Sequence, residues 1–180
     1  VDVLTQPLLM RPWKPLLRRF VAAIYEQFNH VICVSSQYAR QVKRFNIASH
    51  VHFISNAIDF TGDEATGVPP QSPFRVLYVG RLTPEKNVGL LLNAFALLLK
   101  QSSDVELYIV GQGTQAKELK QLTATLGIEK YVTFAGHVAH EDLPKMYVTG
   151  HVFVMPSLVE TQGLVALEAM RFKLPVIVTD

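Results

Sequence analysis

The sequence has few of the features that mark disulfide-linked, membrane-spanning or nucleic-acid-binding proteins. Cys33 is the single cysteine among 180 residues, which excludes a disulfide framework and a cysteine-ligated zinc site and favours a reducing compartment. The longest apolar-rich run, Val88–Leu99, is too short to span a bilayer and contains Asn93. The formal net charge of +2 is close to balanced, so no nucleic-acid partner is expected. We therefore predict a soluble, cytoplasmic protein or the soluble part of one.

Short apolar runs alternate with helical patterns along the chain. Several of the runs lack a period of two, as is typical of parallel strands that are covered on both faces. The expected strands are 31–34, 51–54, 76–79, 105–110, 132–135, 152–155 and 176–178. The expected helices are 12–28, 36–45, 87–101, 115–126, 141–147 and 161–172. This alternation predicts an α/β fold, a Rossmann-like doubly wound parallel sheet.

One segment, 61–73 (TGDEATGVPPQSP), interrupts this alternation. It is polar, rich in glycine and proline and without a period, so we interpret it as a linker. Residues 74–180 carry five expected strands and four expected helices, most of a Rossmann-like domain, and stop directly after a strand. Residues 1–60 carry two strands and two helices, too few for a domain. We therefore expect the tail of an N-terminal α/β domain over 1–60 and a second domain, incomplete at its C-terminus, over 74–180.

Ligands of open parallel sheets bind beyond the carboxyl ends of the strands, which makes the turns after the expected strands the candidate sites. The turn GRLTPEKN begins with Gly80 and carries Arg81 and Lys86, five residues apart. Two cations at a strand end, facing helix N-termini, form an anion site, and phosphate is the commonest small anion in such folds. The alternative is that both side chains are ordinary solvated charges.

Two further turns carry weaker signals. Gly111 and Gly113 let the backbone approach a ligand or simply form a tight turn, and the tight turn is the favoured interpretation. In FAGHVAH, His137 and Val138 could offer an apolar ledge to a nucleotide base. His137 and His140 could also suggest a metal, but no acid or cysteine is positioned by sequence to complete that site, so no metal is expected.

The stretch 157–173, SLVETQGLVALEAMRFK, carries one acid at the start of its expected helix and a second in the middle. Gly163 lies in the first turn, where free backbone N–H groups would face a ligand. Along a helix Glu160 and Glu168 would be about 10 Å apart, close to the separation of the two sugar rings in a nucleoside diphosphate sugar. Each carboxylate could then accept hydrogen bonds from one ring. Alternatively Glu168 lies on a helix edge that reaches water, although its apolar neighbours argue against this.

These motifs together resemble retaining glycosyltransferase family 4, which has the GT-B fold. ETQGLVALEAM is similar to the EX7E motif of that family, GRLTPEKN to its G-R-x-x-x-x-K-(G/N) loop, FAGHV to its base-side turn and SNAID to its N-G-V-D sequence. The resemblance runs from about His30 to Asp180. It implies a uridine, guanosine or adenosine diphosphate sugar as donor, a retained anomeric configuration, and neither a cofactor nor a required metal.

The resemblance also implies a role for each matching residue. Arg81 and Lys86, in the loop opened by Gly80, would bind the diphosphate. Glu160 would contact the donor sugar, and Glu168 would contact the ribose. Backbone contacts to sugar and phosphate would come from Thr161, Gln162, Gly163 and Leu164, and the base would be bordered by His137 and Val138.

The chain departs from the family pattern at a few positions. Gln162 replaces a residue that is commonly Phe, which would alter the sugar pocket. Phe172 and Lys173 replace a Cys-Gly pair, and Ala57 replaces the Gly of N-G-V-D; these changes look structural. The first domain of the family, with its glycine-rich loop and acceptor-side groups, is absent, so we expect this chain alone to transfer nothing.

Other interpretations stay open from the sequence. One is a nucleotide-binding or regulatory GT-B module without transfer activity, and another is a GT-B epimerase or phosphorylase. A phosphorylase would need a Schiff-base lysine, and no lysine here has that context. The acceptor would be a glycan or a lipid-linked molecule. The helix expected at 12–28 could make a peripheral contact with the inner face of a membrane, but packing against a further domain is the favoured interpretation.

Overall fold

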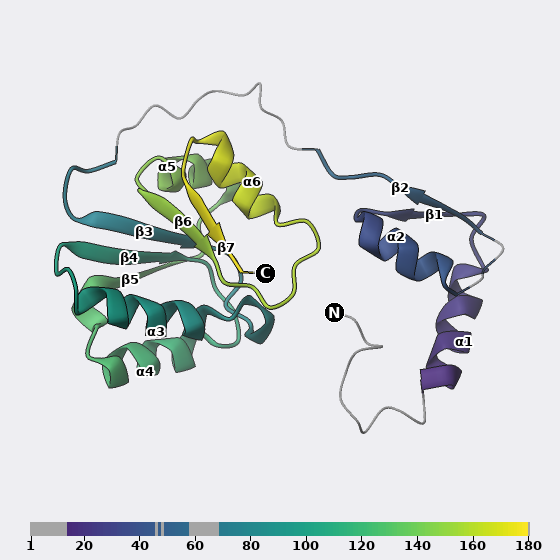
Figure 1. Cartoon of the computed structure of the whole chain (residues 1–180), viewed down its shortest axis with the longest axis horizontal. Helices are drawn as coiled ribbons and strands as arrows, with labels where there is room; N and C mark the ends of the chain where they lie inside the picture. Colours follow the sequence, from purple (N-terminus) through teal and green to yellow (C-terminus); the bar gives the residue numbers. More distant parts are fainter. Residues whose placement is uncertain (1–13, 46, 48, 58–68, 180) are drawn as a thin grey trace. The chain divides into compact units, whose positions relative to one another are not determined.

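The computed structural model describes residues 14–45, 47, 49–57 and 69–179 (Figure 1). The chain divides into two compact units, Val1–Ala57 and Ile58–Asp180. Most of the predicted linker lies outside the described residues, as do the start of the helix predicted at 12–28 and the last two residues of SNAID. Among the described helices, none combines the length and the apolar character that a membrane crossing requires.

The described part of the first unit contains two helices and a small parallel sheet. Its elements are α1 (Lys14–Tyr25), β1 (His30–Cys33), α2 (Ser36–Lys43) and β2 (His50–Phe53). The Ser35 side chain caps α2 by accepting a hydrogen bond from the backbone N–H of Gln37.

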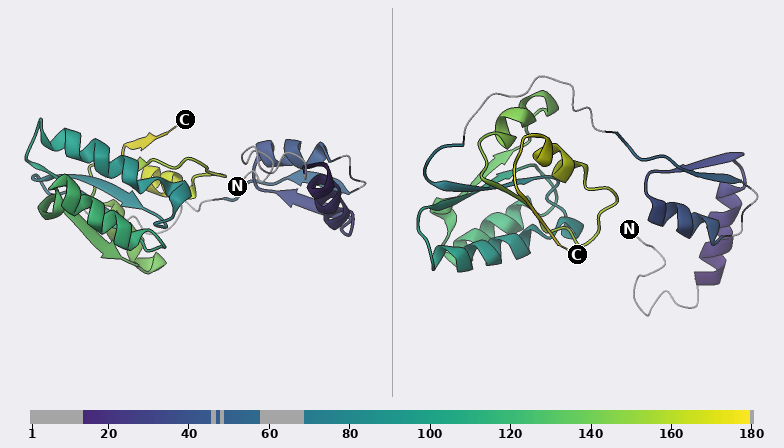
Figure 2. Two further views of the ribbon diagram at one scale, coloured as in Figure 1. Left: turned by 90° about the horizontal axis from the view of Figure 1, so that it is seen from below. Right: turned by 45° about the horizontal axis from the view of Figure 1, so that its top comes forward.

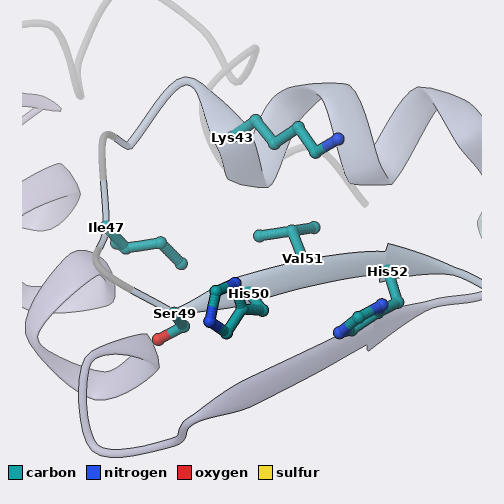
Figure 3. A pocket seen from close by; sticks show the side chains of 6 residues that line it. All are labelled: Lys43, Ile47, Ser49, His50, Val51 and His52. Atoms are coloured by element: carbon teal, nitrogen blue, oxygen red, sulfur yellow. The ribbon is translucent and has the colours of Figure 1, made fainter.

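The two faces of this sheet differ in burial. Cys33 forms a small core with Ala39 and Val42 of α2, and Val51 packs against that core. Because side chains alternate along a strand, His50 and His52 lie on the other face and are exposed. Figure 3 shows these two rings on the opposite side of β2 from Val51.

The second unit is a five-stranded, wholly parallel sheet with strand order β5-β4-β3-β6-β7. Its strands are β3 (Phe74–Val79), β4 (Val105–Val110), β5 (Val132–Gly136), β6 (Val152–Met155) and β7 (Val176–Val178). Its helices are α3 (Val88–Leu99), α4 (Ala116–Leu126), α5 (Leu143–Tyr147) and α6 (Leu164–Arg171), with short 3-10 turns η2 (Pro84–Lys86), η3 (Glu129–Tyr131) and η4 (His140–Asp142). The chain runs outward from β3 to β5 and then returns to β6 on the other side of β3. The strand order therefore reverses between β3 and β6, and this is the place where such sheets bind ligands.

Helices cover both faces of the sheet, as Figures 1 and 2 show. Val76 and Tyr78 of β3 point into a core shared with residues of α3 and α4, such as Leu92 of α3. Leu77 and Val79 point into a second core with α5 and α6. This two-sided burial explains why the strand sequences are apolar without a period of two. The predicted Rossmann-like doubly wound α/β fold is confirmed.

One predicted helix begins later than expected. The sequence pattern placed its start at Thr161, but α6 begins at Leu164 because Gly163, the residue before it, has a φ of 63°. That left-handed conformation is costly for other residues and does not continue a helix. The prediction that Gly163 lies inside the first turn is therefore wrong. The estimate of about 10 Å between Glu160 and Glu168 assumed one continuous helix. It no longer applies, because Glu160 precedes α6.

Candidate functional site

The turns after β3 and β4 are packed directly against each other. A Cβ atom on Gly111, which has a φ of 139°, would lie 1.9 Å from the carbonyl oxygen of Gly80. A Cβ atom on Gly113 would lie 2.3 Å from the carbonyl oxygen of Leu82. Two hydrogen bonds join the turns, from Leu82 N–H to the Gln112 carbonyl at 3.0 Å and from Gln115 N–H to the Leu82 carbonyl at 2.9 Å. These glycines therefore permit close backbone packing, which fixes the base of the cationic loop.

The loop after β3 carries its own counter-charge for Arg81. The Arg81 guanidinium lies 3.4 Å from Glu85 Oε1, and its side chain is 73% exposed. The Thr83 hydroxyl donates a hydrogen bond of 2.8 Å to the same oxygen. The pKa of Glu85 is lowered, first by its own backbone N–H and then by the Thr83 hydroxyl, with smaller effects from the two cations. Glu85 is therefore ionised at neutral pH and pairs with Arg81. The contact is long and the Arg81 side chain is exposed, so the guanidinium can turn towards a stronger anion.

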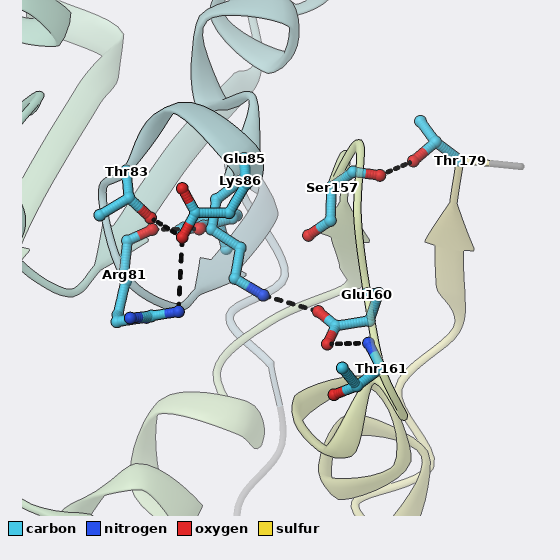
Figure 4. Close-up of polar contacts among 9 residues, drawn as sticks. Arg81, Thr83, Glu85, Lys86, Ser157, Glu160, Thr161 and Thr179 are labelled. Carbon is cyan, nitrogen blue, oxygen red and sulfur yellow. Dashed lines mark hydrogen bonds and ion pairs between the residues drawn. The ribbon is translucent and has the colours of Figure 1, made fainter. Parts of the chain in front are cut away.

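The second cation of the loop is paired with the first acid of the 157–173 stretch (Figure 4). Lys86 Nζ lies 2.6 Å from Glu160 Oε2, and the two side chains are 17% and 26% exposed. The other carboxylate oxygen of Glu160 accepts a hydrogen bond of 2.9 Å from Thr161 N–H. Burial raises the pKa of Glu160, but the Lys86 ammonium and the N–H groups of Thr161 and Gly163 outweigh burial, so the pKa is lowered. Glu160 is therefore ionised in this arrangement.

Backbone contacts hold the loop that carries Glu160. Leu158 N–H donates a hydrogen bond of 2.8 Å to the carbonyl of Glu85, which joins this loop to η2. The Thr179 hydroxyl donates one of 2.7 Å to the carbonyl of Ser157, which joins it to the end of β7. The Ser157 hydroxyl itself is buried and, within the described residues, has no hydrogen-bond partner. In Figure 4 it lies on the side of its chain that faces Lys86.

The second acid has a protein partner that the sequence did not reveal. Glu168 Oε2 accepts a hydrogen bond of 2.8 Å from the Tyr147 hydroxyl. Tyr147 is fully buried, and its ring stacks on Phe172 at a centroid distance of 5.5 Å. Burial and the bond to Glu168 both raise the pKa of Tyr147, so the phenol stays protonated and donates. Glu168 is half-buried, and its Oε1 keeps its hydrogen-bonding capacity.

The predicted base-side residues directly follow β5. His137 is exposed, and Val138 packs against the core beneath α5 and α6. Within the described part of the chain, no hydrogen bond or ion pair joins either residue to Lys86 or Glu160. The structure therefore brings Arg81, Lys86 and Glu160 into one cluster, while the base-side role of His137 and Val138 stays a prediction.

Several residues of the site were missed from the sequence. The buried Tyr78 hydroxyl donates a hydrogen bond of 2.8 Å to the carbonyl of Arg81. Its pKa is raised by burial and, to a lesser extent, by the charges of Glu160 and Glu85. Tyr78 occupies the strand face that the apolar pattern assigned to the core. No local signal separated it, or Tyr147, from ordinary core residues.

Comparison with known proteins agrees with this fold. Residues 60–180 match the family model described as glycosyl transferases group 1, and residues 5–61 match the one described as glycosyltransferase family 4. The chain belongs to the group 1 glycosyl transferases. Its fold is that of GT-B glycosyltransferases, as in the structure of sucrose-phosphate synthase from Thermosynechococcus elongatus. That structure has a TM-score of 0.74 and 28% sequence identity, and the match covers 91% of this chain and 44% of that one.

The chain is also similar to curated glycosyltransferases. An alpha-D-kanosaminyltransferase of Streptomyces kanamyceticus is 36% identical over 105 residues, which is 58% of this chain and 27% of that protein. A GDP-mannose-dependent alpha-(1-6)-phosphatidylinositol monomannoside mannosyltransferase of Mycobacterium tuberculosis is 29% identical over 180 residues, which is 91% of this chain and 47% of that protein. The chain thus spans between a quarter and a half of the length of these two relatives.

Proposed function

We propose that this chain is the donor-binding part of a retaining glycosyltransferase, which moves a sugar from a nucleoside diphosphate sugar to a glycan or lipid-linked acceptor. The observation that carries the proposal is the 2.6 Å contact between Lys86 Nζ and Glu160 Oε2. It joins a cation from the turn after β3 to an acid from the turn after β6, where the strand order reverses. A diphosphate needs a cation, and the sugar attached to it needs a group that accepts hydrogen bonds from its hydroxyls, so the two groups must lie side by side.

The ion pair also defines what donor binding must change. Lys86 would exchange the Glu160 carboxylate for a phosphate oxygen, and Arg81 would leave its loose contact with Glu85 to join it. Glu160 would then be free to accept hydrogen bonds from sugar hydroxyls. Both cations would oppose the negative charge that grows on the departing diphosphate, which is the main electrostatic contribution expected in such a transfer.

The remaining predicted residues have roles around this centre. The free oxygen of Glu168 would accept a hydrogen bond from the ribose. Backbone groups from Thr161 to Leu164, at the start of α6, would contact sugar and phosphate. The names of the relatives, two transferases and a synthase, favour transfer over the epimerase and phosphorylase alternatives. The donor class is supported by the mannosyltransferase relative, whose name specifies GDP-mannose as its donor.

A titration with uridine, guanosine and adenosine diphosphates tests donor binding and identifies the base. Wild-type chain is expected to bind one of them, and Lys86→Ala should weaken diphosphate binding while leaving nucleoside binding nearly unchanged. Lys145→Ala is the matched control, because Lys145 is also paired with an acid, Asp142 at 2.6 Å, but its side chain is 72% exposed on another element. Equal losses in the two variants, or no binding by the wild type, would contradict the proposal.

Transfer itself is to be measured with the full-length enzyme. With the identified donor and an acceptor, analysis of the product by NMR reports the anomeric configuration, and retention is expected. Inversion of the configuration would leave donor binding intact and overturn only the retaining mechanism.

A further inference from the structure

Three histidine side chains gather on the exposed face of the small sheet in the first unit. β1 and β2 are parallel, with His30 opposite His50, and His52 follows two residues later on the same face. His30 Nδ1 lies 2.9 Å from His52 Nε2. The His30 ring is stacked on the His50 ring at a centroid distance of 5.4 Å. None of these three histidines belongs to the cluster of Arg81, Lys86 and Glu160 described above.

We propose that His30 and His52 form a bidentate site for a divalent late first-row transition ion such as Ni²⁺, Cu²⁺ or Zn²⁺. Two imidazole nitrogens 2.9 Å apart share one proton, since one must donate and the other accept. A metal ion can take the place of that proton. Metal–nitrogen bonds of about 2.0–2.1 Å at a right angle place the two nitrogens about 2.9 Å apart. The observed spacing therefore fits adjacent corners of a square-planar or octahedral centre after the rings turn their lone pairs towards the ion.

The surroundings indicate a site that water completes. Within the described part of the chain, no group of three or more histidine, cysteine, aspartate or glutamate side chains is placed to hold a metal. His50 stacks on His30 rather than facing its ring nitrogen, so it is a neighbour and not a third ligand. A cavity of ≈ 360 Å³ beside His30 and His50 gives solvent access and is also lined by Glu26, whose negative charge favours a cation. The ion would thus bind through two protein ligands and exchange readily.

Binding would have a mechanical consequence for the first unit. The two ligands belong to different strands and are 22 residues apart in sequence. An ion held by both would link the start of β1 to β2. Because the unfolded chain does not keep the two rings together, binding would stabilise the folded state in proportion to the logarithm of the ion concentration.

Nickel titration of the untagged, metal-free chain tests the site by calorimetry and by thermal unfolding. The variants are His30→Gln and His52→Gln, with His50→Gln as the matched control from the same face. Wild type and His50→Gln are expected to bind one ion per chain and to unfold at a higher temperature with nickel. Each of the other two variants should lose affinity by about tenfold or more. Unchanged binding in either of them, or an equal loss in His50→Gln, overturns the assignment.

A second measurement needs no variant and covers the case in which a substitution prevents folding. Substoichiometric Cu²⁺ broadens the NMR signals of the rings that bind it. The signals of His30 and His52 are expected to broaden first and to recover when EDTA is added. Earlier broadening of His137, His140 or His151 would overturn the proposal. Nucleoside diphosphate binding is measured separately, so failure of the metal site does not bear on the proposed transfer.

Discussion

The Tyr147 hydroxyl and Glu168 are joined by a hydrogen bond of 2.8 Å that crosses from α5 to α6. Tyr147 is 1% exposed and held by stacking on Phe172, so its hydroxyl is a fixed donor. It restrains one oxygen of Glu168 and leaves the other able to accept a further hydrogen bond. The otherwise apolar helix α6 therefore carries an acid, Glu168, whose orientation is fixed by Tyr147, a residue of the core between the sheet and α5 and α6.

Tyr147→Phe removes only the hydroxyl, so its effects measure this hydrogen bond. We expect the free energy of unfolding to fall by about 1 kcal/mol or somewhat more, since the acceptor is charged. We also expect weaker nucleoside binding, because Glu168 would lose its fixed orientation. Urea unfolding and nucleoside titration measure the two effects. Tyr131→Phe is the control, and an unchanged nucleoside affinity in Tyr147→Phe would show that the bond is only structural.

Replacing the two predicted donor contacts should affect different parts of the ligand. A hydrogen bond to a charged group contributes about 1.5–3 kcal/mol, so Glu168→Gln should lower donor affinity by roughly ten- to a hundredfold. Arg81→Ala should weaken nucleoside diphosphate binding far more than nucleoside binding, since the ribose contact survives. Calorimetric titration of both ligands against both variants separates the effects. If Glu168→Gln binds nucleoside like the wild type, Glu168 is a structural acid.

Much of the fold could be predicted from the sequence because strands that are buried on both faces appear in it as short apolar runs. The runs at 105–110, 152–155 and 176–178 coincide with β4, β6 and β7. Helix ends were predicted less well, since they depend on single dihedral angles such as the positive φ of Gly163. Helix propensity alone does not show whether a glycine lies inside the first turn of a helix or directly before its first residue.

The sequence singled out Arg81, Lys86 and Glu160, which the structure brings together, but it did not predict the contact between Lys86 and Glu160. Lys86 and Glu160 are 74 residues apart, and their pairing depends on the chain returning to place β6 beside β3. A helical rise counted along the sequence could not give this proximity. The sequence did not indicate that the Tyr147 hydroxyl donates to Glu168 or that the Ser157 hydroxyl is buried, because both depend on the surrounding three-dimensional structure.

The ion pair between Lys86 and Glu160 should make stability depend on pH in acid. The pKa of Glu160 is lowered in the folded protein, so its stabilising contribution is complete above the ordinary glutamate pKa of about 4.3. That contribution is lost as the pH falls through the lower, folded-state pKa. Glu160→Gln should therefore be less stable than the wild type at about pH 6, and this difference should shrink as the pH falls below about 4.3. Urea unfolding across this range is the measurement, with exposed Glu129→Gln as control. A pH-independent difference would argue against a charge effect.

Removal of divalent ions should leave sugar transfer intact. The proposed role of Arg81 and Lys86 is to neutralise the diphosphate, which is the work a metal ion does in other transferases. The full-length enzyme is therefore expected to keep its activity in EDTA. An activity that EDTA abolishes and only a divalent ion restores would show that the cationic loop is insufficient.

Removing the Ser157 hydroxyl and removing the Thr179 hydroxyl should have opposite effects on the free energy of unfolding. The Ser157 hydroxyl is buried and, among the described residues, lacks a partner, so it carries a desolvation cost of about 1–3 kcal/mol. Ser157→Ala removes that cost and should raise the free energy of unfolding. The Thr179 hydroxyl instead donates to the carbonyl of Ser157 at 2.7 Å, in a part-buried hydrogen bond. Thr179→Val should lower the free energy of unfolding by about 1 kcal/mol, because that carbonyl loses its donor.

Urea unfolding of both variants, with and without a nucleoside diphosphate, completes this test. If a bound donor supplies the missing partner of Ser157, Ser157→Ala will be more stable than the wild type alone but will gain less from the ligand. Thr179→Val should gain as much from the ligand as the wild type does, provided that the loop keeps its position. Destabilisation by Ser157→Ala in the absence of ligand would mean that the hydroxyl already has a partner in solution, such as a buried water molecule, and the argument from its unpaired state would fail.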